Sequence, residues 1–275
     1  MKIRLDQLLV ARGLVESRAR AQALILAGVV YVGDTRVDKA GTAVADDADV
    51  SVRGGDHKYV SRGGLKLEGA LDDFAIDPRG MRCLDLGAST GGFTDCLLQR
   101  GAEAVVAVDV GYGQLAHKLR VDPRVDVRER TNGRTLTAEA IGGAVDLAVV
   151  DASFIGLGLL LPALARTVRE GGALVGLIKP QFEVGREEAS RARGVIKDEA
   201  VRRRAIGGVL DEVVTSGFEI VATTDCKVPG PKGNVEAFVY ARRIPAAASS
   251  SPKSTSIDPS STDDATAADQ GSRTS

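Results

Sequence analysis

Runs of apolar residues recur through the middle of the chain, separated by glycine-bounded segments of mixed polarity. Several runs contain no polar residue, such as 104–108 and 147–150. Continuous apolar runs are typical of strands that are buried on both faces beneath covering helices. The pattern predicts strands at 82–87, 104–110, 125–129, 145–151, 173–179, 218–225 and 235–242. Helices are predicted between them at 93–100, 112–119, 157–169 and 198–216.

This alternation predicts a doubly wound α/β domain with a seven-stranded sheet. Only a short loop containing Pro229 and Pro231 separates the last two strands. A parallel crossover needs a dozen or more residues, so the final pair should be an antiparallel hairpin at the sheet edge.

The first 58 residues have a different pattern. Leu5, Leu8 and Leu9 indicate a short helix that ends near Gly13, and Ser17 is a suitable N-cap for a second helix. Strand signals follow at 29–37 and 49–52. A unit of fewer than about 60 residues is only marginally stable alone, so we expect a small α+β module appended for binding.

These patterns divide the chain into the small module at 1–58, a linker at 59–66, the α/β domain at 67–244 and a tail at 245–275. The tail is rich in Ser, Ala, Thr and Asp, and Ile257 is its only aliphatic residue larger than alanine. Such a segment cannot bury enough apolar surface to order itself, so we expect it to be disordered.

Composition excludes several classes of protein. The three cysteines are far apart and there are only two histidines, which argues against a disulfide framework, a zinc module or any other metal site. Asp6 interrupts what would be the apolar core of a signal peptide, and no apolar run approaches 18 residues, so we expect a cytoplasmic protein without a membrane span. Because 36 basic residues nearly balance 37 acidic ones, any nucleic-acid binding must come from a local patch.

A glycine-rich loop is the first chemical signal. Gly87, Gly91 and Gly92 lie between a predicted strand and a predicted helix, and Asp109 ends the next strand. Such glycines let the backbone approach a ligand, and an acid at the second position accepts hydrogen bonds from ribose hydroxyls. The spacing is not the GxGxxG that serves a pyrophosphate, so an adenosyl cofactor without phosphates fits better than NAD. Glycines here can also simply allow tight packing, and Asp109 favours the cofactor interpretation.

Two further strand ends have ionisable groups. Asp151 and Lys179 each close an apolar strand. Ligands of open α/β sheets bind outside the carboxyl ends of the strands, so both side chains should face the cofactor cleft. A structural ion pair is the alternative interpretation.

Seven blocks, taken in order, make the chain resemble the TlyA family of ribosomal RNA 2′-O-methyltransferases, which is often labelled haemolysin A. The blocks are 58–67, 84–94, 109–115, 129–132, 151–155, 179–183 and 233–236, within a resemblance that covers about residues 3–243. The resemblance implies an N-terminal S-four-type RNA-binding domain and an FtsJ-like, Rossmann-like class I methyltransferase domain that uses S-adenosylmethionine. It suggests cytidines of 16S and 23S ribosomal RNA as targets, within ribosomal subunits, and no obligate protein partner is evident.

The resemblance also implies site residues. A catalytic tetrad would consist of Lys66, Asp151, Lys179 and Glu236, with Lys179 our candidate for the base that removes the ribose proton. Cofactor contacts would be Gly87, Ala88, Ser89, Gly91, Gly92, Asp109, Glu129, Arg130, Thr131, Asn132 and Asp151. Phe154 could flank the site, although an aromatic residue just past a strand is more often part of a core.

Five basic residues are candidates for RNA contact. These are Arg4 on the first predicted helix, Arg18 and Arg20 at the start of the second, and Lys58 and Arg62 near the linker. Ordinary solvated surface charges are the alternative for each. Another structured RNA is the alternative substrate, and a membrane-active haemolysin is less well supported because no segment combines a large apolar face with a basic face.

Overall fold

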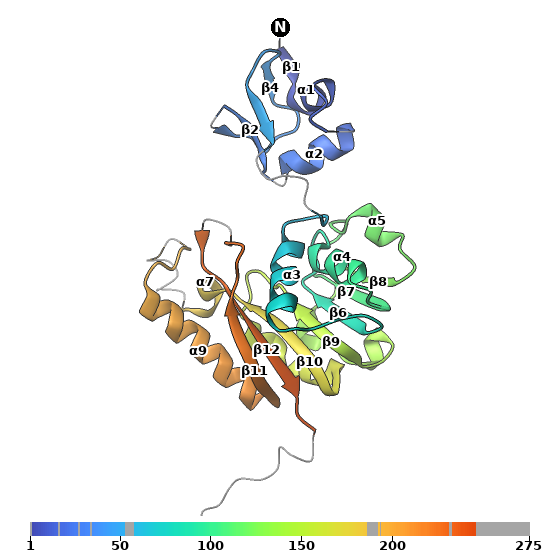
Figure 1. Ribbon diagram of the computed structural model, residues 1–275, viewed down its shortest axis with the longest axis vertical. Helices are drawn as coiled ribbons and strands as arrows, with labels where there is room; N and C mark the ends of the chain where they lie inside the picture. The colour runs from blue at the N-terminus through green and yellow to red at the C-terminus, as the bar shows by residue number, and fades with distance from the viewer. Residues whose placement is uncertain are drawn as a thin grey trace, which may run out of the picture.

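The computed structural model describes residues 2–15, 17–26, 28–33, 35–52, 58–185, 192, 194–230 and 233–245. The chain forms a small N-terminal unit, up to residue 52, and a larger α/β unit from residue 58 onward (Figure 1). Each unit has a hydrophobic core made only of its own residues. The predicted tail lies outside the described residues from position 246 onward.

Seven strands form the mixed sheet of the larger unit, in the order β11-β12-β10-β9-β6-β7-β8. Their bounds are β6 Arg82–Leu86, β7 Ala104–Val108, β8 Val125–Arg128, β9 Val145–Val150, β10 Val168–Ile178, β11 Phe218–Asp225 and β12 Ala237–Arg243. Strands β6 to β10 pair in parallel, whereas β12 is antiparallel to both β10 and β11. The predicted seven-stranded α/β sheet with a terminal antiparallel hairpin is confirmed.

Helices cover both faces of this sheet (Figure 1). One face has α3 Gly63–Asp73, α4 Gly92–Gln99 and α5 His117–Arg120. The other has the 3-10 helix η3 Leu157–Leu160, α6 Leu161–Thr167 and α9 Glu199–Thr215. Because side chains alternate across a strand, neighbours such as Cys83 and Leu84 enter different cores, and both are fully buried. Three short helices complete the unit, namely η1 Gly133–Thr135, η2 Glu139–Ile141 and α7 Pro180–Glu183.

The N-terminal unit is a small α+β structure, as expected. Its elements are β1 Lys2–Arg4, α1 Leu5–Ala11, α2 Arg18–Leu26, β2 Val30–Val32, β3 Thr35–Arg36, β4 Ala43–Ala45 and β5 Val50–Val52. Leu5 and Leu9 of α1 pack with Ile25 of α2, and all three are fully buried. Strand β1 pairs with β4, while β2 lies between β3 and β5.

Four local predictions differ from the structure. Arg4 lies in β1, before the first helix rather than on it. The helix α3 was not predicted, because it opens on two glycines that are poor helix formers. Strand β10 begins at Val168, five residues earlier than expected, and a register shift against β9 accommodates Gly171 at a φ of +70°. The helix expected over 112–119 is limited to α5, because Gly113 has a φ of +70°.

Candidate active site

The glycine loop joins β6 to α4 where three backbone segments approach closely. A Cβ atom on Gly87 would lie 2.7 Å from the carbonyl oxygen of Asp151, which follows β9. A Cβ atom on Gly92 would lie 2.8 Å from the backbone nitrogen of Gly64 in α3. Because backbone atoms cannot move aside as a flexible side chain can, a larger residue at either position would displace the loop.

Asp85 of β6 supports the helix that follows this loop. Its Oδ2 accepts hydrogen bonds from the backbone N–H of Thr94 at 2.8 Å and from the Thr94 hydroxyl at 2.6 Å. The N-cap residue of α4 is Gly91, which has no side chain, so the strand carboxylate satisfies one of the free N–H groups of the first turn. Burial, and to a lesser extent the charges of Asp151 and Asp109, raises the pKa of Asp85 to about 7.

Asp109, immediately after β7, is held by the backbone. Its Oδ2 accepts the N–H of Ser89 at 2.8 Å, and its Oδ1 accepts the N–H of Gly111 at 2.7 Å. Each carboxylate oxygen has a second acceptor position, so the side chain is oriented without being saturated. The arrangement suits the ribose contact that the sequence predicts for this residue.

Two adjoining cavities lie at the carboxyl ends of the central strands. The larger one, of about 380 Å³, contacts Asp109, and the smaller one, of about 200 Å³, contacts Lys66 and Lys179. Gly87, Ser89, Asp151 and Ser153 line both. The larger volume lies within the range of about 300–1,000 Å³ that is usual for small-molecule sites.

Most of the cofactor residues expected from the sequence line these cavities. Those that do so are Gly87, Ala88, Ser89, Gly92, Asp109, Thr131, Asn132 and Asp151. Gly91, Glu129 and Arg130 line neither of the two. Glu129 instead pairs with Arg120 at 2.5 Å, and the guanidinium of Arg130 lies 4.2 Å from the ring centroid of Tyr112.

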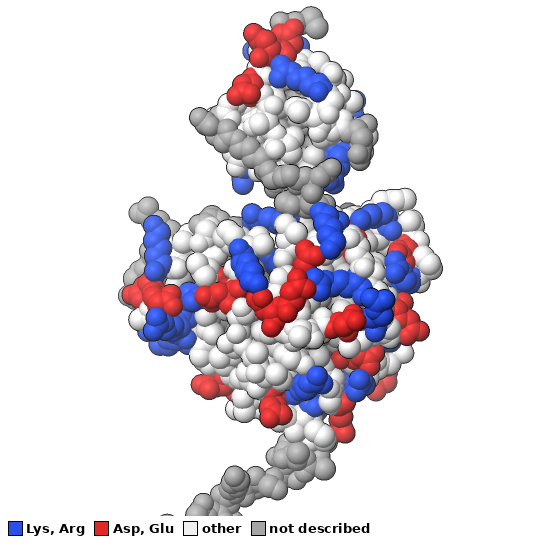
Figure 2. Space-filling model, viewed as in Figure 1, with Lys and Arg blue, Asp and Glu red and all other residues white. Residues whose placement is uncertain are grey.

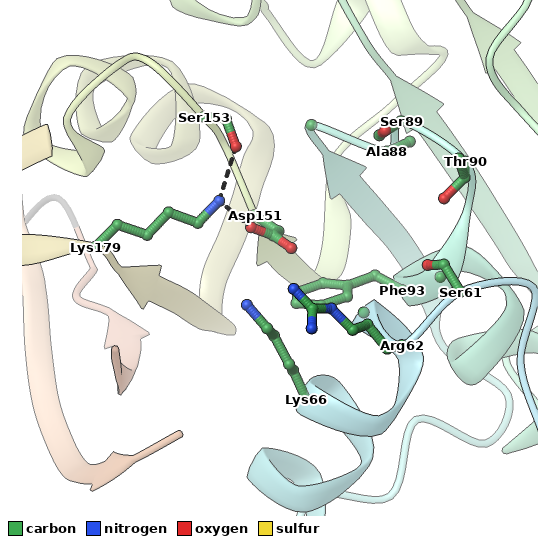
Figure 3. A pocket seen from close by; sticks show the side chains of 13 residues that line it. Ser61, Arg62, Lys66, Ala88, Ser89, Thr90, Phe93, Asp151, Ser153 and Lys179 are labelled. Atoms are coloured by element: carbon green, nitrogen blue, oxygen red, sulfur yellow. Dashed lines mark hydrogen bonds and ion pairs between the residues drawn. The ribbon is translucent and has the colours of Figure 1, made fainter. Parts of the chain in front are cut away.

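Lys179 follows β10 and points into the smaller cavity, toward the end of β9 (Figure 3). Its Nζ lies 2.5 Å from Oδ1 of Asp151, in an ion pair without the alignment of a directed hydrogen bond. The same Nζ donates a hydrogen bond to the hydroxyl of Ser153 at 2.9 Å. The Lys179 side chain is 8% exposed, so its ammonium position is well defined by these two partners.

Lys66 reaches the same cavity from α3 (Figure 3). Its Nζ lies 2.5 Å from Oε2 of Glu236, and the Glu236 side chain is fully buried. Glu236 directly precedes β12, so this pair joins the helix on one face to the antiparallel hairpin. The four residues of the expected tetrad therefore form two ion pairs, Lys66 with Glu236 and Lys179 with Asp151.

Sequence reasoning missed three polar residues of the smaller cavity and assigned a fourth elsewhere. Ser61, Thr90 and Ser153 line it, and the spacing of Ser153 two residues after Asp151 was the available signal. Arg62, expected at the RNA, lies beside Lys66 and lines the same cavity (Figure 3).

The interpretation of Phe154 as a core residue is wrong. Its side chain is 92% exposed, and its backbone has a φ of +65°, a conformation that is unfavourable for a bulky residue. It lines the larger cavity, and its ring centroid lies 5.5 Å from that of Phe182, just beyond Lys179. An exposed aromatic side chain in a strained backbone is more typical of a binding surface than of packing.

Residues 59–62 are fastened to the α/β unit rather than free. Tyr59 is buried and donates its hydroxyl hydrogen bond to Glu68 at 2.9 Å, and the N–H of Val60 donates to Asp95 at 2.8 Å. Lys58 pairs with Glu68 at 2.7 Å, with its own side chain 55% exposed. This attachment fixes the start of α3, and therefore the position of Lys66.

In the N-terminal unit, two of the predicted RNA contacts share one buried carboxylate. Asp6 is fully buried and accepts hydrogen bonds from Arg4 at 3.0 Å and from Arg18 and Gln22 at 2.9 Å. The hydrogen bonds from Arg4, with those from Gln22 and Arg18, hold the pKa of Asp6 well below its usual range. Arg4 and Arg18 remain about half exposed, and Arg20 is partly buried in α2.

Charge is not segregated on the visible face of the larger unit. On the face drawn in Figure 2, basic and acidic side chains are interspersed. No group of three or more His, Cys, Asp or Glu residues that could hold a metal ion occurs among the described residues. In that same part of the chain, no helix is long and apolar enough to cross a membrane.

A seven-stranded sheet with an antiparallel terminal hairpin, a glycine loop after the first central strand and an acid after the second define a class I methyltransferase fold. Comparison with known proteins agrees. A model of the FtsJ-like methyltransferases matches residues 59–243, and a model of the S4 domain matches residues 3–50.

Individual relatives narrow the class further. The 16S/23S rRNA (cytidine-2′-O)-methyltransferase TlyA of Mycobacterium tuberculosis is 50% identical over 88% of this chain and 90% of the relative. The putative rRNA methyltransferase YqxC of Bacillus subtilis is 43% identical over 87% and 85%. A solved structure described as a putative hemolysin from Streptococcus thermophilus is 39% identical, with a TM-score of 0.70, over 88% and 89% of the two chains. The chain belongs to the TlyA family of FtsJ-like methyltransferases, which confirms the resemblance found in the sequence.

Proposed function

We propose that this chain transfers a methyl group from S-adenosylmethionine to the ribose 2′-hydroxyl of cytidine in 16S ribosomal RNA, 23S ribosomal RNA or both. The observation that carries this proposal is the meeting of two lysine–carboxylate pairs, both with a buried lysine, at a cavity beside the glycine loop. The named activity of the 50% identical relative supports the substrate.

The larger cavity is our candidate site for the cofactor. S-adenosylmethionine supplies an electrophilic methyl carbon when bound. The free acceptor positions of Asp109 suit ribose hydroxyls, and Thr131 and Asn132 line the part of the cavity assigned to adenine. Gly87 and Ser89 line both cavities and would lie where the cofactor meets the substrate.

Lys179 is the proposed base. Methyl transfer to a hydroxyl requires the oxygen to be held in line with the methyl group while its proton is removed. Asp151 and Ser153 hold the Nζ of Lys179 at the cavity, so the amine is oriented before substrate arrives. In the proposed step, Lys179 first releases one ammonium proton to solvent. The resulting amine accepts the 2′-hydroxyl proton as the oxygen–methyl bond forms and the methyl–sulfur bond of S-adenosylmethionine breaks, which leaves S-adenosylhomocysteine.

Lys66 would act on the same oxygen as a cation. Glu236 is fully buried and pairs with Lys66, so the ammonium has a compensating charge and a defined place. An ammonium near the attacking oxygen stabilises the negative charge that develops there. The two lysines would therefore have different roles: Lys179 accepts the proton, and Lys66 stabilises the negative charge on the oxygen.

In this proposal, residues 1–58 bind the RNA, residues 59–66 link the two units, and residues 67–244 carry out methyl transfer. The match to the S4 domain supports RNA docking by the first unit. Arg4, Arg18, Arg20 and Lys58 are the proposed phosphate contacts, with Arg62 at the entrance to the active site. The target nucleotides would lie within ribosomal subunits, which places the reaction in the cytoplasm.

The test is incubation of the purified protein with methyl-labelled S-adenosylmethionine and unmethylated 30S or 50S subunits, followed by digestion of the RNA. We expect labelled 2′-O-methylcytidine from at least one subunit, and its loss in a folded Lys179→Ala variant. Thr215→Ala, at the end of α9 and lining neither cavity, is the control and should retain full activity.

The alternatives give different results in the same experiment. Cofactor binding without transfer to either subunit would overturn the ribosomal substrate and direct the search to another structured RNA. Substantial transfer by folded Lys179→Ala would overturn the assignment of the base. Lysis of erythrocytes by the purified protein, without methyl transfer, would instead support a haemolysin.

A further inference from the structure

Gln181 connects the two ion pairs of the active site. It lies in α7, two residues after Lys179, and its Nε2 donates a hydrogen bond to Oε1 of Glu236 at 3.3 Å. The other oxygen of Glu236 receives Lys66 at 2.5 Å. One carboxylate is therefore held by Lys66 from α3 and by an amide from the segment that begins with Lys179.

The orientation of the Gln181 amide follows from its partner. A carboxylate can only accept hydrogen bonds, so Nε2 must face Glu236. This leaves Oε1 of Gln181 buried and without a hydrogen-bond partner among the described residues. An unsatisfied buried acceptor costs free energy, so such an atom calls for an explanation, and a functional role is one.

Among the described residues, few other groups restrain the Glu236 carboxylate. Its backbone carbonyl accepts the N–H of Cys226 at 2.8 Å, which fixes the main chain but not the carboxylate. A Cβ atom on Gly230 would lie 2.4 Å from Oε1, so the main chain closes that side without donating to it. Lys66 contacts one oxygen of the Glu236 carboxylate, and the hydrogen bond from Gln181 to the other oxygen stops the carboxylate from rotating about its Cγ–Cδ bond.

We propose that Gln181 is a positioning residue for methyl transfer, which holds Glu236, and through it Lys66, in register with Lys179. The proposal rests on the function proposed above, since it assigns a role within that same site. Because Lys179 is the N-cap residue of the short helix α7 that contains Gln181, a displacement of Lys179 on substrate binding would be transmitted to the Lys66–Glu236 pair. The two lysines then move as one unit.

Gln181 lines neither of the two cavities, which separates this role from cofactor binding. Its replacement should therefore lower kcat while the affinity for S-adenosylmethionine stays within about twofold. A purely structural role would instead lower stability and both kinetic constants together.

The experiment compares wild type, Gln181→Met, Glu236→Gln and the double variant in single-turnover methyl transfer, with cofactor affinity measured by calorimetry. Gln181→Met keeps the length of the side chain and removes its donor. We expect it to slow transfer by about tenfold to a hundredfold, as small misplacements of reacting groups do. In the Glu236→Gln background, the same substitution should change the rate by less than about twofold, because its target is already altered.

Two results would overturn the proposal. One is an equal slowing by Gln181→Met in both backgrounds, and the other is a loss of cofactor affinity as large as the loss of rate. Rescue by Gln181→Asn is not expected, since the shorter amide cannot reach Glu236. If wild type itself transfers no methyl group to either subunit, the proposed function fails, and that result is distinct from a failure of the role of Gln181.

Discussion

Lys66 and Glu236 are 170 positions apart in the sequence, and their side chains form a buried ion pair with an Nζ–Oε2 distance of 2.5 Å. The pair fastens α3 on one face of the sheet to the hairpin at its edge. It therefore contributes to the fold as well as to the proposed chemistry, and the two contributions can be separated by substitution.

Loss of either partner should destabilise the protein. In Glu236→Met the Lys66 ammonium is left buried without compensation, which costs about 3–5 kcal/mol for pairs of this kind. The double variant Lys66→Met with Glu236→Met should recover most of that loss, because apolar side chains of similar size can replace a buried pair. Urea unfolding measures the stability. Methyl transfer should be lost in both single variants, Glu236→Met and Lys66→Met, and in the double variant. A double variant no more stable than the singles would contradict this account.

Phe154 provides a test of the substrate surface. Because its side chain is 92% exposed, Phe154→Ala should change the free energy of unfolding by less than about 1 kcal/mol. The same variant should raise the KM for the RNA substrate several-fold, since exposed aromatic rings beside an active site stack on unpaired bases. Leu159→Ala, a second exposed apolar residue that lines neither cavity, is the matched control. Unchanged KM in Phe154→Ala would exclude this role.

Asp6 offers a test of RNA docking by the N-terminal unit. Asp6→Asn removes the charge that orients Arg4 and Arg18, so the affinity for ribosomal subunits should fall several-fold while the affinity for S-adenosylmethionine is unchanged. Filter binding and calorimetry give the two constants. Because the pKa of Asp6 is lowered in the folded state, its stabilising effect is present at neutral pH and is lost as the pH falls below about 4. Equal RNA affinity of variant and wild type would contradict the proposal.

Asp85 should make stability depend on pH in the opposite direction. Burial raises its pKa to about 7, above the value of about 3.9 in an unfolded chain, so the folded state binds the extra proton between these values. The contribution of this group to stability therefore falls as the pH rises from 4 to 7, by on the order of 4 kcal/mol. Asp85→Asn mimics the neutral acid and should remove this fall, which urea unfolding at a series of pH values would reveal. The control is Asp77→Asn, at an exposed aspartate of the same unit.

The sequence predicted the architecture well where the pattern was continuous. The strand over 218–225 agrees with β11 at both ends, and the apolar runs 104–108 and 147–150 lie in β7 and β9. The predicted element boundaries were wrong where a glycine lies inside a helix or a strand instead of between two elements. Gly171 lies outside both the predicted helix 157–169 and the predicted strand 173–179, but it belongs to β10, at a register shift. Gly63, which falls in the predicted linker, opens the helix α3.

The site was predicted less completely than the fold, for a physical reason. Motif spacing places Asp151 and Lys179 at neighbouring strand ends, because parallel strands share one edge. The same spacing does not predict which carboxylate pairs with each lysine. Lys66 lies in a helix and Glu236 in a hairpin, and the distance between them depends on the packing of the whole sheet. The exposed side chain of Phe154 and its positive φ have no counterpart in the sequence pattern.

Strand β12 lies between β11 and β10 although it is the last of the three to be synthesised. Glu236 immediately precedes it, so Lys66 has no partner until the ribosome has made the chain beyond residue 236. An unfinished polypeptide can hold the glycine loop and Lys179 and still lack one of the two ion pairs of the candidate site. The order of synthesis therefore delays completion of the proposed site until the chain beyond residue 236 has emerged from the ribosome, the very particle whose RNA the finished enzyme is proposed to modify.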